Sequence, residues 1–291
     1  MARRPVSRQT FWGLALVLAV LTVPPQAGES RGEQGGPLGL APRALVEVDR
    51  ADQAAPLVPG AKRFLSPAPP EPSVRGVLGL SLPFLPGPSE AAAPQDWEVQ
   101  EFTGSARFQV AQVGRTGVIR LESEETSFAL HRDVEVDLTA FPYLTWAWRV
   151  DVLPHGGDVR RPDTDDQAAQ LYVVFPRFPA MVRSRIVGYI WDSSAPVGST
   201  LVSAATELAR IVVLQSGPGR TGRWIQETRN LLEDYRRLFQ EDPPPVGRIT
   251  LLINSQHTRS RAVAWFGPIR FAPQLPRGAA VPVKASLQLQ P

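Results

Sequence analysis

The sequence predicts a mainly β protein: a single β-sandwich domain, jelly-roll-like, with one short covering α-helix, preceded by a signal peptide and a Pro-rich spacer. After residue 96, many short runs of β-branched and aromatic residues alternate with Gly, Pro, Asp or Ser, which is the pattern of a sandwich or jelly roll. A single segment in that region has helical spacing. Before it the composition differs, since 14 of the 30 prolines lie between Pro24 and Pro94.

The first 27 of the 291 residues are expected to be a cleaved secretory signal peptide. Arg3, Arg4 and Arg8 precede an apolar run over 11–23, and the small residue Ala27 follows two prolines. This order is typical of a signal peptide, and the run is shorter than the roughly 20 residues of a membrane span. An uncleaved N-terminal anchor is the alternative. We therefore expect an exported protein, periplasmic or secreted, with no membrane span after signal removal.

Charge and cysteine content exclude several classes of function. The three arginines of the signal carry the whole formal net charge of +3. The remaining chain is balanced, so the main argument for binding nucleic acid is lost. The chain has no cysteine, which excludes a disulfide framework, a thiolate metal site, a cysteine nucleophile and a lipid-anchor cysteine.

Residues 28–95 are predicted to be a Pro/Gly/Ala-rich spacer that is largely irregular. Two parts of it have the pattern of ordered structure. Residues 44–49 alternate as a short strand does, and 77–85 form an apolar segment that can dock on the domain. The sandwich is expected over 96–275, followed by a flexible tail over 276–291.

Thirteen strands are expected within the domain. A turn is expected at 217–222, between the strands at 211–215 and 223–228. The strands cover 97–102, 107–113, 117–122, 127–131, 134–138, 143–152, 169–175, 185–191, 211–215, 223–228, 248–254, 262–266 and 269–271. These segments are short and bounded by turn residues, as in a sandwich built from many strands.

The one expected helix covers 230–240. Its apolar residues recur at i, i+1, i+4, i+7 and i+8, which gives one apolar face. Thr228 or Asn230 can cap its start, and the prolines at 243–245 end it. We expect this helix to cover one end or face of the sandwich, and a helix that carries a site is the alternative.

Several motifs together resemble a known family. They are Trp146–Val150, Asp165–Asp166 leading into Leu171–Phe175, Tyr189–Trp191, and Arg229–Phe239 with the following 241–244. In this order, over about 97–271, the chain resembles the bacterial exported family known as domain of unknown function 3047. The resemblance implies no activity. More distantly, it implies a fold similar to jelly-roll modules that bind sugars in other exported proteins.

The sequence departs from that family at two places. Family members usually have an Asp-rich stretch where this chain has Asn254–Thr258, and an Asp where it has Pro268. If those acids hold a calcium ion or a ligand in the relatives, the resemblance implies that this chain has lost that site.

Aromatic residues are the first candidates for ligand binding. Trp146 and Trp148 lie two apart on an expected strand and so share a face, while Arg149 points to the other face. Together with Trp191 from another strand, an exposed pair would stack on sugar rings. If that face points inward, the indoles are simply core.

Clustered acids are the second candidates. Asp165 and Asp166 end an acidic loop, and oxygen-rich clusters can bind Ca²⁺, so calcium is the one cofactor considered and the metal stays unknown. A solvated loop, or ion pairing with Arg149, Arg160 or Arg161, is the alternative.

A third cluster lies on the expected helix and its approach: Arg229, Glu233, Asp234 and Tyr235. Adjacent helical residues diverge by roughly 100°, so Glu233 and Asp234 cannot face each other as a catalytic pair. A glycoside hydrolase or lyase would instead pair Asp166 with Glu233, with Arg229 and Tyr235 as stabilising groups. Capping and ion pairing are the alternative reading of these residues.

These observations predict a non-catalytic ligand-binding protein, whose partner is carbohydrate or an envelope component. The expected binding residues are Trp146, Trp148, Arg149, Asp165, Asp166, Trp191, Arg229 and Asp234. A carboxylate-dependent glycosidase or lyase is the first alternative, and a structural envelope protein is the second.

Overall fold

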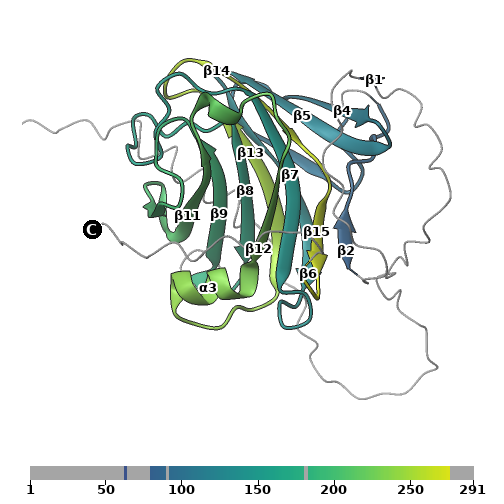
Figure 1. The fold of residues 1–291 in the computed structure, drawn as a ribbon, viewed down its shortest axis with the longest axis vertical. Helices are drawn as coiled ribbons and strands as arrows, with labels where there is room; N and C mark the ends of the chain where they lie inside the picture. The colour runs from purple at the N-terminus through teal and green to yellow at the C-terminus, as the bar shows by residue number, and fades with distance from the viewer. Residues whose placement is uncertain (1–61, 64–78, 90–91, 180–182, 276–291) are drawn as a thin grey trace, which may run out of the picture.

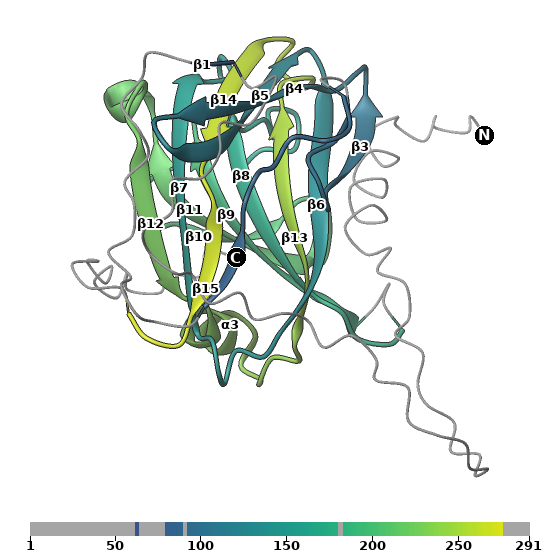
Figure 2. The same cartoon turned by 90° about the vertical axis from the view of Figure 1, so that its right-hand side faces the viewer.

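The fold is a sandwich of two β-sheets that face each other, with a short helix at one end (Figure 1 and Figure 2). The computed structural model describes residues 62–63, 79–89, 92–179 and 183–275. The expected signal over 1–27, the strand expected over 44–49 and the tail over 276–291 lie outside these residues. Within the described ranges, no helix is long and apolar enough to cross a membrane.

The first sheet, called sheet A, is centred on the ten-residue strand β7 (Tyr143–Val152). Its order is β1 (Lys62–Arg63), β4 (Arg107–Val113), β5 (Thr116–Glu124), β14 (Arg261–Phe266), β7, β15 (Ile269–Ala272) and β2 (Leu80–Leu82), and β12 (Ile225–Asn230) also pairs with β7. Phe266 pairs with Trp148 and Arg270 pairs with Thr145. β14 and β15 therefore follow the same edge of β7 as one strand interrupted after Phe266, and β12 takes the other edge.

The second sheet, called sheet B, has seven strands. Their order is β10 (Thr200–Ser203), β11 (Thr206–Ser216), β9 (Arg185–Asp192), β8 (Ala169–Phe175), β13 (Val246–Asn254), β6 (Ser127–Val136) and β3 (Glu98–Thr103). β11 and β9 run parallel, and the other neighbours in this sheet are antiparallel. After β9 the chain forms β10 and then reverses into β11, which lies between β10 and β9.

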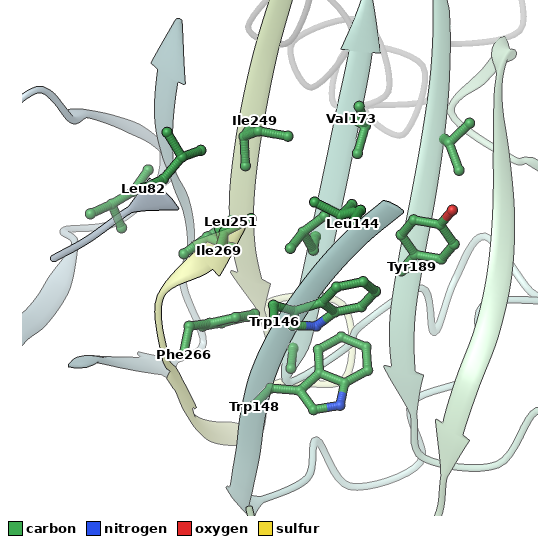
Figure 3. Packing of buried hydrophobic residues seen from close by; sticks show 14 of the residues in the cluster. Leu82, Leu144, Trp146, Trp148, Val173, Tyr189, Ile249, Leu251, Phe266 and Ile269 are labelled. Atoms are coloured by element: carbon green, nitrogen blue, oxygen red, sulfur yellow. The ribbon is translucent and has the colours of Figure 1, made fainter. Parts of the chain in front are cut away.

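The main core fills the space between the sheets because alternate residues of each strand point inward. Even-numbered residues of β7 meet odd-numbered residues of β9: Trp146 lies 5.3 Å from Tyr189, and Trp148 lies 6.3 Å from Trp191, between ring centroids. Figure 3 shows Trp146, Trp148 and Tyr189 directed into this space with Phe266 beside them.

The helix α3 (Leu231–Phe239) begins directly after β12 and lies across one end of the sandwich (Figure 1). The side chain of Asn230 caps it by accepting a hydrogen bond from the amide of Glu233 at 3.2 Å. The left-handed Gln240, with φ of 55°, ends it. Tyr235 packs on Phe175 at 4.5 Å between ring centroids, which fixes the helix against the last residue of β8.

The expected mainly β sandwich with one helix is confirmed, and several strands differ from their predicted form. The segments expected at 127–131 and 134–138 are one strand, β6, because Arg132 and Asp133 continue the pairing with β13. β2 and β10 were not predicted. The turn expected at 217–222 holds the 3-10 turn η1 (Pro218–Arg220). Leu82 and Phe84, within the segment expected to dock on the domain, are buried in the core.

Candidate functional site

The three tryptophans proposed as a stacking surface lie in the core between the sheets. Trp146, Trp148 and Trp191 are each at most 1% exposed. Trp146 and Trp148 lie on the inward face of β7, and Trp191 faces them from β9. The three indoles therefore belong to the core, and they form no solvent-facing platform. Their contribution is to the packing of the two sheets.

Arg149 points to the outer face of sheet A, as expected for the residue that follows Trp148 along the strand. Its Nε donates to Asp151 at 2.6 Å, and its guanidinium lies 5.9 Å from the ring centroid of Trp265. Asp151 also accepts a hydrogen bond from the indole of Trp265 at 2.8 Å. Arg149 therefore pairs with Asp151 on its own strand, whereas an ion pair with the acidic loop had been the expected alternative.

The acidic loop before β8 is paired within itself. Arg160 bonds Asp158 through both Nε and Nη2, at 2.8 and 2.7 Å, and Arg161 bonds Asp163 at 3.1 Å. Across the described residues, no group of three or more His, Asp or Glu side chains is arranged to hold a metal ion. Among the described residues, the acidic loop therefore does not form a cluster of this kind for calcium.

Asp166 has a structural role in joining two loops. It is fully buried and accepts hydrogen bonds from the amide and the hydroxyl of Thr258, both at 2.7 Å, and from the amide of His257 at 3.3 Å. Its two oxygens thus hold the 254–258 segment against the start of β8. The hydrogen bond from His257 to Asp166 raises the pKa of the imidazole despite its partial burial.

Asp165 belongs to a polar cluster beside this junction. Its Oδ1 accepts from Gln167 at 3.0 Å, and its backbone oxygen accepts from Asn254 at 2.6 Å. Burial raises the pKa of Asp165 to about 6. Asn254 also accepts from Gln170 at 2.7 Å, so the amide side chains of Asn254 and Gln170 bond one another beside Asp165.

Arg229 and Asp234 form a buried ion pair that fixes α3 to both sheets. The guanidinium donates from Nε and Nη2 at 2.7 and 2.6 Å, and the hydroxyl of Tyr189 donates to the same carboxylate at 2.7 Å. Arg237 adds a fourth bond at 3.1 Å. Burial and the charge of Asp234 raise the pKa of Tyr189 well above its ordinary value. In the structure these residues therefore form ion pairs, as the alternative interpretation of the cluster expected.

The carboxylates of the alternative enzyme do not come together. Asp166 lies just before β8, whereas Phe175 at the other end of β8 packs on Tyr235 of α3. A seven-residue strand is about 20 Å long, so Asp166 and the exposed Glu233 lie at opposite ends of the sandwich. A glycosidase needs its two carboxyl groups within about 5–10 Å. The hydroxyl of Tyr235 instead donates to Glu241 at 3.0 Å.

Glu227 is a partly buried acid that sequence reasoning missed. Glu227 on β12 faces inward between the sheets, where its Oε1 accepts from Gln215 at 2.7 Å and from the indole of Trp148 at 3.2 Å. Burial raises the pKa of Glu227 to about 7. Alternation along the strand expected at 223–228 places Glu227 on the same face as the apolar Ile225. This is the signal in the sequence that could have identified Glu227.

The main candidate for ligand binding is a cavity between α3 and the edge of sheet B, which we call the α3 cavity. Its volume is about 510 Å³. It is lined by Arg185, Val202, Glu207, Leu208, Arg210, Leu238, Phe239 and Gln240. Figure 1 shows how α3 lies against the ends of β9 and β11, the strands that supply the two arginines.

The wall of the α3 cavity is built around Phe239, the last residue of α3. The guanidinium groups of Arg185 and Arg210 lie 5.6 and 5.4 Å from the centroid of its ring, within the range of cation–π attraction. Leu238 and Leu208 add apolar surface. The cavity therefore combines planar charged groups with apolar side chains.

Sequence reasoning missed the α3 cavity because its residues come from separate elements. Val202 lies on β10, which was not predicted, and Arg210 lies before the segment expected at 211–215. Phe239 was assigned to the apolar face of the helix, where it does pack on Tyr235 at 4.9 Å. The recurring arginines gave no signal, since nearly every basic residue of the chain is Arg.

Comparison with known proteins identifies a family. Residues 95–270 match the model of a family described as Protein of unknown function (DUF3047). No curated protein matches the chain.

Among solved structures, the chain is similar to the family 11 carbohydrate-binding module of a cellulosomal cellulase of Clostridium thermocellum, with 7% identity, 70% of this chain and 100% of that chain covered, and a TM-score of 0.37. It is similar to the family 11 xylanase from Neocallimastix patriciarum, with 8% identity, coverage of 60% and 87%, and a TM-score of 0.32. It is also similar to the K1 cleaved adhesin domain of Lys-gingipain from Porphyromonas gingivalis, with 12% identity, coverage of 66% and 96%, and a TM-score of 0.32. At these identities the likeness concerns the fold.

Proposed function

Because the chain belongs to the DUF3047 family, whose description states no activity, we propose its function from its own structure: it is a non-catalytic module that binds carbohydrate in the α3 cavity. The observation that carries the proposal is the pairing of two guanidinium groups with one aromatic ring at the wall of a cavity of about 510 Å³. Small-molecule sites commonly measure about 300–1,000 Å³.

The chemistry of the lining suits a sugar. Sugars present hydroxyl groups around their edge and C–H groups on their faces, so a sugar site needs planar hydrogen-bonding side chains beside apolar surface. Arg185, Arg210, Glu207 and Gln240 supply the first, and Val202 with its neighbouring leucines supplies the second. Val202 is 49% exposed, so the cavity is reached from solvent on the β10 side.

Direct binding measurements test this proposal. Calorimetry against a panel of neutral and acidic oligosaccharides is expected to find at least one that binds the wild-type protein. The change Phe239→Ala removes the ring on which both guanidinium groups rest, and we expect it to weaken that binding about tenfold or more.

The matched control is Phe108→Ala. Phe108 is also partly buried, but it lies on β4 in sheet A and packs on the main core. We expect this variant to bind as the wild type does, and near-UV circular dichroism checks that both variants keep their tertiary structure. If no glycan binds the wild type, or if both variants lose binding equally, the proposed function is wrong.

Export is a second part of the proposal, and it rests on the signal anatomy of residues 1–27. We expect the mature protein recovered outside the cytoplasm to begin near Gly28, because cleavage after Ala27 fits the small residue there. N-terminal sequencing of the fractionated protein checks this expectation. Recovery of a chain beginning at Met1 would show that the segment is retained.

A further inference from the structure

The charges around the α3 cavity are unequally matched. Arg185 shares the carboxylate of Glu241 with Arg177, at 3.2 and 3.0 Å respectively. In contrast, no carboxylate among the described residues lies within 4.0 Å of the Arg210 guanidinium, although the exposed Glu207 contributes a more distant attraction. Arg210 is therefore the cation of this wall whose charge is least compensated.

Arg210 is held in place while part of its hydrogen-bonding capacity stays unused. Its Nη1 donates to the backbone oxygen of Glu207 at 2.7 Å and to that of Ala209 at 3.3 Å. A guanidinium has five N–H groups, and the Nε and Nη2 groups of Arg210 make no hydrogen bond within the part of the chain that the structure describes. A planar pair of free donors is the arrangement that a carboxylate accepts through both oxygens.

Two like charges share the ring of Phe239, and this arrangement favours an anion between them. Burial lowers the pKa of Arg210, and the neighbouring charge of Arg185 lowers it further. An anionic group in the cavity would reduce this repulsion and would replace the water lost by the guanidinium. The apolar side chains Val202, Leu208 and Leu238 line the same cavity and suit the ring that bears such a group.

We propose that the α3 cavity selects sugars that carry a carboxylate, with Arg210 as the residue that binds the carboxylate and Arg185 as a second cation beside it. This inference rests on the proposed function, since it names the class of carbohydrate bound at the same site. The ligand is a uronic acid residue, within a glycan or at its end.

The experiment compares glycans that differ only in the carboxylate. Galacturonate, mannuronate and guluronate trisaccharides are each titrated into the wild-type full-length protein by calorimetry, beside the same trisaccharides after reduction of their carboxyl groups to alcohols. We expect at least one uronate to bind about tenfold or more tightly than its reduced counterpart, as befits a hydrogen-bonded charge pair. The affinity for that uronate is also expected to fall as salt is raised.

Two variants assign the preference to Arg210. Arg210→Gln removes the charge, and we expect the uronate to bind it no better than the reduced sugar does. Arg210→Lys keeps the charge without the planar fork, and we expect an intermediate preference. Arg107→Gln is the control, because Arg107 lies on β4 in sheet A and pairs with Glu124 in a largely exposed ion pair.

The outcomes separate the two proposals. If reduced and unreduced sugars bind equally, selection of a carboxylate is wrong while carbohydrate binding stands. If the uronate is preferred and Arg210→Gln leaves that preference unchanged, the assignment to this cavity is wrong. If none of these sugars binds, the inference about uronic acids is wrong, and the wider oligosaccharide panel decides whether the proposed function stands. If Arg210→Gln does not fold, Arg210→Lys and the salt dependence of the wild type decide the question.

Discussion

At the scale of single residues, Asp234 is the buried acid on which the position of α3 depends. We predict that Asp234→Ala lowers the free energy of unfolding by about 3–5 kcal/mol, because it leaves the guanidinium of Arg229 buried without its partner. Chemical denaturation followed by circular dichroism measures this change. Asp163→Ala is the control, since Asp163 forms a surface pair with Arg161, and the expected change is below about 1 kcal/mol. Equal losses in both variants would contradict the prediction.

The acid Glu227 predicts a dependence of stability on pH. Its pKa is about 7 in the folded protein against the ordinary 4.5 in the unfolded chain. Below pH 4.5 both states hold the proton, and above pH 7 both have lost it. Between these values only the unfolded chain has ionised, so a rise in pH favours unfolding, by up to about 3 kcal/mol over the whole interval.

The variant Glu227→Gln isolates this effect because it keeps an oxygen for Trp148 and Gln215 but cannot ionise. The free energy of unfolding of the variant minus that of the wild type is expected to rise between pH 4.5 and 7 and to be constant outside that interval. Urea denaturation at a series of pH values measures it. Asp165 titrates in the same interval in both proteins, so the difference removes its contribution. A difference that does not vary with pH would show that Glu227 ionises normally.

Single residues also mark the limit of what the sequence could predict. Spacing showed that Trp146 and Trp148 share a face, because side chains alternate along any strand. Which face is inward depends on the partner sheet, and here Tyr189 and Trp191 of β9 cover it. Trp265 shows the opposite case, since it lies on the outer face of its strand beside Arg149. Ion pairing of Arg229 and Asp234 was among the alternatives, because the two residues belong to one charged cluster at the start of the expected helix.

At the scale of elements, the start of α3 predicts a measurable contribution to stability. Asn230→Ala removes the side-chain oxygen that accepts from the amide of Glu233. We expect the free energy of unfolding to fall by about 1 kcal/mol. Asn230→Asp should keep most of the stability, because aspartate also caps helices and carries a charge favourable at a helix start. Thermal unfolding compares the two, and equal loss in both variants would exclude capping as the cause.

Elements with strong local patterns were predictable, and elements defined by their neighbours were not. β4, β7 and β8 have the predicted bounds because alternation and turn residues define them locally. β10 is only four residues long and is defined by its pairing with β11. The α3 cavity depends on this same strand, so the part of the fold that sequence reasoning missed is also the part that encloses the candidate site.

At the scale of the whole molecule, the sandwich includes a segment that composition assigned to the spacer. β2 pairs with β15 at the edge of sheet A, and the residues after it enter the main core. Phe84 packs on Trp97 at 5.1 Å between ring centroids. The apolar pattern predicted that 77–85 docks on the domain, but the prolines around it indicate irregular backbone, so the strand β2 and its pairing were not predicted.

The packing of this segment leads to a prediction about the whole fold. Leu82 and Phe84 are each 1% exposed, whereas Leu80 and Leu85 in the same segment are 37% and 43% exposed. We expect the double change Leu82→Ala, Phe84→Ala to lower the free energy of unfolding by about 4 kcal/mol or more, since it creates cavities in the shared core. The double change Leu80→Ala, Leu85→Ala removes similar apolar side chains and should cost less than about 1 kcal/mol.

Denaturant unfolding of the two double variants decides whether the segment belongs to the cooperative fold. If it does, the core variant should unfold in one transition at a clearly lower denaturant midpoint, and the exposed variant should keep the midpoint of the wild type. If the segment only rests on the surface, both variants should unfold as the wild type does. In that case the sandwich would be complete without β2, and the residues that close its core at this edge would have to come from β15 and β7 alone.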